Sequence, residues 1–145
     1  MEELDDLRAF VQHGDYEAAL ALIDELDAMP RDDKLTKIEG YMQILLVHCI
    51  KQAAEQRTTR SWDVSIAEAA RRIAKVNKRR KAGGWYLATD DLQDTLADEY
   101  AAALRRAALE VHEGLHTPEQ LAVLLERDTV ISTAWAHITA AIQQG

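Results

Sequence analysis

Apolar residues recur along the whole chain at spacings of three and four positions, and no segment alternates apolar and polar residues over the length of a strand. This periodicity gathers apolar side chains on one face of a helix. It predicts an all-α protein, and the short connections favour an antiparallel multi-helix bundle of six to seven helices. The predicted helices cover about 4–11, 16–26, 31–55, 62–76, 90–113, 118–127 and 129–143.

The third predicted helix, 31–55, is the most apolar segment and is expected to form the centre of the core. Its stripe includes Cys49, the only cysteine, which we interpret as a buried thiol, with a reactive cysteine as the alternative. His48 precedes it, but adjacent helical residues point about 100° apart, so a catalytic Cys/His pair is not favoured. A buried or half-buried His48 with a backbone or carboxylate partner is the expectation.

A chain of 145 residues fits a single domain, and we expect residues 1–145 to form one all-helical domain. Residues 12–26 are similar to one hairpin of a tetratricopeptide repeat, but no second copy follows at the required period. The amino terminus is acidic, and no run of about 18 uncharged apolar residues occurs. We therefore expect a cytoplasmic protein that does not associate with membranes.

The net charge of −8 is distributed unevenly along the chain. Residues 1–35 carry a net charge of −8, residues 36–50 of zero, residues 51–81 of +7 and residues 82–145 of −7. A basic middle between acidic ends can guide the docking of a charged partner, or it can be satisfied inside the fold.

The stretch 112–116, HEGLH, matches the H-E-x-x-H motif of zinc hydrolases. That motif binds zinc only when one helix continues through both histidines and places them on the same face. Here Gly114 is expected to end the preceding helix, and Thr117 and Pro118 are expected to begin the next one with a T-x-x-Q capping box. We expect the two imidazoles to diverge, so zinc hydrolysis by His112, Glu113 and His116 is a weaker alternative and no metal is predicted.

The run 71–81 contains seven bases and no acid, and Trp85 follows it after two glycines. Phosphate contacts with aromatic stacking on single-stranded nucleic acid are one reading of this pattern. A solvated or internally paired basic face is the other reading, because the rest of the chain is acidic and basic residues at a helix end stabilise its dipole. The candidate anion-binding or partner-binding residues are Arg57, Arg60, Arg71, Arg72, Lys75, Lys78, Arg79, Arg80, Lys81 and Trp85.

The middle of the chain resembles an uncharacterised bacterial family, domain of unknown function twenty-nine. The resemblance rests on an L-L-x-H-x-x-K helix at 45–51, a polar turn with Gln56 and Arg57, and R-S-W-x-x-S-I at 60–66. It implies an all-helical domain and brings no established activity, cofactor or catalytic residue. Arg57 stands where members often have a proline. We favour a structural role for Arg57 and Arg60 over anion binding at the helix start.

The sequence contains no phosphate-binding loop, no dinucleotide glycine pattern and no nucleophile elbow. These absences leave an enzyme unsupported without excluding one, and no cofactor is expected. The expected function is a non-enzymatic protein–protein interaction module, with an unidentified protein or a second copy of the chain as its partner. Nucleic-acid or anion binding through residues 71–81 is the alternative, and nucleic acid is not the expected partner.

Overall fold

The computed structural model describes residues 2–28, 31–79 and 83–144, and within these ranges it contains helices and no β-strand. The all-α prediction is therefore confirmed. The elements are α1 (Glu2–Gln12), α2 (Tyr16–Ala28), α3 (Arg31–Glu55), α4 (Arg60–Asn77), α5 (Thr89–Ala108), the 3₁₀ turn η1 (Val111–Gly114), α6 (Pro118–Val123) and α7 (Arg127–Gln144).

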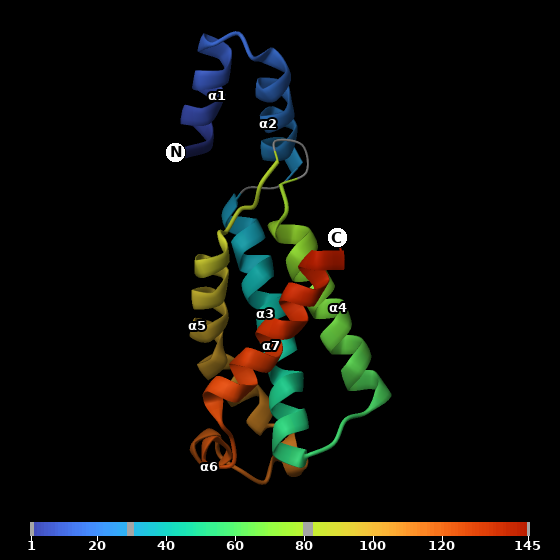
Figure 1. Cartoon of the computed structure of the whole chain (residues 1–145). Helices are drawn as coiled ribbons and strands as arrows, with labels where there is room; N and C mark the ends of the chain where they lie inside the picture. Colours follow the sequence, from blue (N-terminus) through green and yellow to red (C-terminus); the bar gives the residue numbers. More distant parts are fainter. Residues whose placement is uncertain (1, 29–30, 80–82, 145) are drawn as a thin grey trace.

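Four long helices, α3, α4, α5 and α7, lie side by side and alternate in direction along the chain (Figure 1). α3 is central, because it contacts each of the other three and contributes more completely buried apolar side chains than any other helix. The short helix α6 lies at one end of this bundle, and the hairpin formed by α1 and α2 lies beyond the other end (Figure 1).

The core is built around the apolar stripe of α3, as its sequence predicts. Ile38, Met42, Leu45, Leu46 and Ile50 are completely buried there. Each such side chain contributes about 1.5–3 kcal/mol when it leaves water. The other long helices add apolar residues to the same cluster. The core therefore fixes the positions of α4 and α7 relative to α3.

Cys49 and His48 on α3 both have the surroundings that the sequence predicts. Cys49 is buried, and burial raises the pKa of its thiol to about 12. The imidazole Nδ1 of the half-buried His48 lies 2.8 Å from the carbonyl oxygen of Ile44. The buried thiol with its raised pKa is therefore a poor nucleophile in this position.

The α1–α2 hairpin is separate from the main core. Its two helices contact each other, and the core cluster contains no described residue from either. Gly14 adopts a φ of +72° between them, and the Asp15 carboxylate caps α2 by accepting the backbone N–H of Ala18 at 3.1 Å. Ala19 and Leu22 are buried within the hairpin.

The connection between α4 and α5 is held by one buried asparagine. Asn77 donates its side-chain amide to the carbonyl of Leu87 at 3.1 Å and accepts the N–H of Leu87 at 2.8 Å. An isolated β-bridge joins Lys78 to Trp85 beside it. These contacts place Trp85 next to the end of α4.

Several predicted helix boundaries are wrong, and one of them is the end of α6, which lies at Val123 and not near residue 127. Thr59, not Ser61, caps α4 by accepting the N–H of Trp62 at 3.1 Å. Ala88, not Thr89, is the N-cap of α5, without a side-chain hydrogen bond. α5 ends at Ala108, not near residue 113, because the chain buries Val111 through a 3₁₀ turn instead of continuing the helix.

Candidate functional site

The H-E-x-x-H stretch lies on a turn. His112 and Glu113 have φ values of 47° and 60°, in the left-handed region, and Gly114 follows with +79°. The predicted break in the helix is confirmed, and so is the T-x-x-Q capping box at Thr117. The prediction that the imidazoles diverge is wrong, because the left-handed residues turn the chain back on itself. The ring centroids of His112 and His116 lie 5.7 Å apart, edge to face.

This close pair of rings lacks a third metal-ligating side chain among the described residues. In the described part of the chain, no group of three or more His, Cys, Asp or Glu side chains is placed to hold a metal ion. The helical spacing on which the zinc motif depends is also interrupted at His112.

A polar recess of about 530 Å³ lies next to this turn. The indole of Trp62 is part of its lining, with the Lys51 ammonium 4.9 Å and the Arg57 guanidinium 4.7 Å from the ring centroid. Lys51 pairs with Glu110 at 3.3 Å, and Arg57 pairs with Glu55 at 2.9 Å. Lys51 and Arg57 thus each have an aromatic and a carboxylate partner within the chain. These contacts are those of residues that hold the fold together.

The basic run on α4 is also partly neutralised by its own helix. The Glu68 carboxylate accepts hydrogen bonds from Arg71 at 2.8 Å and from Arg72 at 2.7 Å. These two bonds hold the pKa of Glu68 below its usual value. The guanidinium of Arg79 lies 5.8 Å from the centroid of the Tyr86 ring. Arg80 and Lys81 lie outside the described residues.

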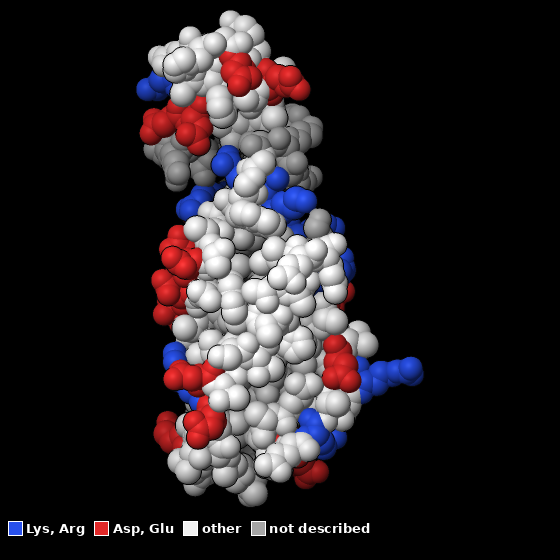
Figure 2. Space-filling model, in the orientation of Figure 1, with Lys and Arg blue, Asp and Glu red and all other residues white. Residues whose placement is uncertain are grey.

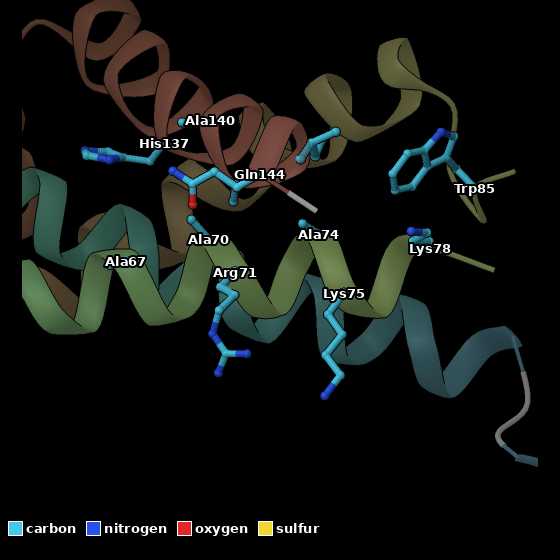
Figure 3. Close-up of a pocket in the computed structure, with 12 residues that line it drawn as sticks. Ala67, Ala70, Arg71, Ala74, Lys75, Lys78, Trp85, His137, Ala140 and Gln144 are labelled. Carbon is cyan, nitrogen blue, oxygen red and sulfur yellow. The ribbon is translucent and has the colours of Figure 1, made fainter. Parts of the chain in front are cut away.

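A second cavity, of about 610 Å³, opens between α4 and α7 near their carboxyl ends (Figure 3). We call it the α4–α7 groove. It is lined by Ala67, Ala70, Arg71, Ala74, Lys75, Lys78, Trp85, His137, Ala140, Ala141, Ile142 and Gln144. On the α4 side the lining residues recur every three or four positions and form one continuous face, and α7 contributes residues from its last two turns, 137–144.

The groove has an apolar floor and a basic edge. Five alanines from the two helices form most of the floor, where small side chains leave the space between the backbones open. The charged ends of Arg71 and Lys75 point away from α7 (Figure 3). Trp85 stands at one end of the groove and is 44% exposed. An apolar segment can therefore enter without displacing a charged group.

The groove brings together four of the residues that the sequence identified as candidates, which are Arg71, Lys75, Lys78 and Trp85. Arg72 and Arg79 lie nearby on the chain but do not line it. Arg57 and Arg60 lie at the amino end of α4, whereas the groove lies towards its carboxyl end. The ten candidates thus do not form one site.

The wall contributed by α7 was not identified from the sequence. Residues 129–144 contain no Asp, Glu, Lys or Arg, and this absence of charge is the signal that marks the wall. Figure 2 shows a broad uncharged surface where α7 crosses the face of the molecule in Figure 1. Depletion of charged residues is typical of the centres of protein interfaces.

Comparison with known proteins relates the chain to a family. The model of a family described as "Domain of unknown function DUF29" matches residues 15–136, which begin near the start of α2 and end within α7. No curated protein and no solved structure matches the chain significantly. Among the described residues, no helix has both the length and the apolar character needed to cross a lipid bilayer.

Proposed function

The chain belongs to the DUF29 family, and we propose that it is a non-enzymatic protein–protein interaction module that binds its partner in the α4–α7 groove. The observation that carries this proposal is the apolar, alanine-lined floor of the groove between two helices that the core holds in place. Small residues on two neighbouring helices admit a third helix at close range. The cytoplasmic location expected from the sequence remains a prediction.

The chemistry of the groove favours an amphipathic helix with acidic residues beside a narrow apolar face. The apolar face would pack on the alanines and against Trp85. The acidic residues would meet Lys75 and Lys78, neither of which forms an ion pair within the described ranges. The uncharged surface of α7 offers no repulsion to either part of such a helix.

Two observations support a protein partner over nucleic acid. Arg71 and Arg72 share the Glu68 carboxylate, which reduces the positive potential available to a phosphate backbone. Exposed apolar surface is also a mark of protein recognition, and it forms most of this cavity.

A charge placed on the floor tests the proposal. We would replace Ala140 by Glu, because this residue lines the groove and is exposed, so that the fold can tolerate the change. Ala136→Glu is the matched control, since Ala136 is exposed one turn earlier on α7 and does not line the groove. Each variant and the unmodified chain would be used to capture proteins from a nuclease-treated lysate of the source organism, followed by mass spectrometry.

We expect at least one protein to be captured by the unmodified chain and by Ala136→Glu, and to be lost with Ala140→Glu. Capture that is equal for both variants would contradict binding in the groove. Capture that occurs from an untreated lysate and is lost from the nuclease-treated one, together with oligonucleotide binding that falls steeply with salt, would support the nucleic-acid alternative.

A further inference from the structure

The hairpin formed by α1 and α2 has an apolar surface that its own chain leaves uncovered. α2 buries Ala19 and Leu22, whereas Tyr16, Leu20 and Ile23 are 65%, 63% and 38% exposed. These three positions have the spacing i, i+4 and i+7, which places them in one stripe on one face of the helix. Exposed apolar stripes of this kind mark surfaces that bind another protein.

The same helix is acidic. Glu17 is exposed beside Tyr16, the exposed Asp15 caps the first turn, and residues 1–35 together carry a net charge of −8. α2 is therefore an amphipathic helix with an apolar stripe and acidic flanks. This is the kind of helix that the α4–α7 groove is suited to bind.

The dimensions and charges of the two surfaces agree. With a rise of about 1.5 Å per residue, the stripe from Tyr16 to Ile23 is about 10 Å long, and the face of α4 from Ala67 to Lys78 is about 16 Å long. The groove can accommodate the full stripe. Its edge carries Lys75 and Lys78, which match the acidic flanks of α2, and Figure 2 shows acidic side chains on the hairpin.

We propose that the α4–α7 groove of one chain binds α2 of a second copy, so that two chains exchange their hairpins in a symmetric dimer. This inference rests on the proposed function, because it names the partner for the same groove. A two-fold arrangement forms the contact twice and leaves neither stripe exposed. Association would be driven by burial of Tyr16, Leu20 and Ile23 and oriented by charge.

Sedimentation of the full chain over a range of micromolar concentrations would test the dimer. We expect a reversible monomer–dimer equilibrium, in which Leu20→Asp and Ala140→Glu each raise the dimer Kd at least about tenfold, equivalent to about 1.4 kcal/mol. Two controls should leave the Kd unchanged. Val64→Asp alters an apolar residue on α4 that is 62% exposed and lies outside the groove, and Ala136→Glu alters α7 outside the groove.

A cross-link would identify the surfaces directly. Chains with Leu20→Cys would be mixed with chains with Ala140→Cys and oxidised, and the native Cys49 is buried and does not compete. We expect a mixed disulfide between the two kinds of chain. A disulfide that forms only when both cysteines are in one chain would mean that the hairpin folds onto its own groove, which would overturn the exchange.

Two further results would also overturn the dimer. One is an unmodified chain that sediments as a monomer at every concentration, and the other is a dimer that persists in both Leu20→Asp and Ala140→Glu. Both would leave the proposed function standing if Ala140→Glu still loses the proteins captured from the lysate. If the Ala140→Glu variant still captures the same proteins, the groove itself is not the binding surface.

Discussion

Gly114 is the residue on which the turn after α5 depends. Its φ is +79°, and a Cβ atom at this position would lie 3.0 Å from the carbonyl oxygen of Leu109. The left-handed backbone and the close approach each disfavour any side chain. Gly40 offers a contrast, because it lies inside α3 and a Cβ atom there would have no neighbour within 4 Å.

Substitution of these two glycines by alanine should therefore have opposite effects. Gly114→Ala is expected to lower the free energy of unfolding by roughly 1–3 kcal/mol, through backbone strain and the contact with Leu109. Gly40→Ala should raise it by roughly 0.5–1 kcal/mol, because alanine restricts the unfolded chain and favours the helix. Urea denaturation followed by circular dichroism measures both changes. Equal effects of the two substitutions would contradict the strained turn.

The sequence was sufficient to predict a turn at Gly114 but not the conformation of the residues before it. His112 and Glu113 also adopt positive φ values, which are uncommon for residues other than glycine. The apolar rhythm of α5 continues to Val111, so the pattern alone extends the helix too far. Burial of Val111 can be achieved by a 3₁₀ turn as well as by a helix, and only the packing decides between them.

At the scale of helices, the sequence predicts each element but not each cap. Thr59 and Ser61 are both good N-cap residues in the same polar turn. In the structure Thr59 is the N-cap, and the helix begins with Arg60. Likewise, the face of α4 that meets α7 depends on the distance between two helices far apart in the chain. The distance between α4 and α7 determines whether a groove forms between them, and a local sequence pattern does not predict it.

The choice of cap can be tested with a pair of alanine substitutions. Thr59→Ala should lower the free energy of unfolding by about 1 kcal/mol, because the N–H of Trp62 loses its hydrogen bond. Ser61→Ala should change it by less than about 0.5 kcal/mol, since Ser61 is an exposed residue that does not cap the helix. Thermal or urea unfolding would compare the two variants. A larger loss of unfolding free energy with Ser61→Ala would mean that Ser61, and not Thr59, caps the helix.

A pair of carboxylates between α3 and α5 should make stability depend on pH. Burial, a hydrogen bond with Glu99 and the like charge of Glu99 raise the pKa of Glu39. The folded state therefore holds this proton more tightly than the unfolded state. The resulting stabilisation is complete below the unfolded pKa of about 4.5 and is lost as the pH rises through the higher folded value.

Glu39→Gln is expected to stabilise the protein at neutral pH and not at pH 4. The gain at pH 7 should be about 0.5 kcal/mol, the size of a like-charge contact near a surface. Asp98→Asn is the control, because Asp98 is exposed on α5 and its replacement removes one negative charge in the same way. Unfolding curves at both pH values give the comparison, and an equal gain from the two variants would point to net charge as the cause.

At the scale of the whole molecule, the chain has a well-packed bundle and a hairpin with little buried surface. The described residues of the hairpin bury Ala19 and Leu22, while the core cluster draws on α3 to α7. The helical class and the central role of α3 followed from the apolar spacing. The separation of the hairpin did not, because its residues show the same spacing as the helices of the core.

Hydrogen exchange should therefore divide the chain into two cooperative units. We expect the backbone amides of α3 around Leu45 to exchange only through global unfolding, whereas those of α1 and α2 exchange through a less costly local opening. The exchange should be measured at protein concentrations below the proposed dimer Kd, where no second chain covers α2. Equal protection of α2 and α3 under those conditions would mean that the hairpin unfolds together with the bundle.

Trp85 gives the protein an optical reporter of its own. The chain has three tryptophans, of which Trp62 is buried and Trp135 packs partly buried against the core, while Trp85 is 44% exposed in the groove. Among the three indoles, that of Trp85 is thus the most accessible to an aqueous quencher such as iodide, so its fluorescence is quenched most. Anything that enters the groove will shield this indole and shift its emission towards shorter wavelengths, so occupancy can be followed without attaching a dye.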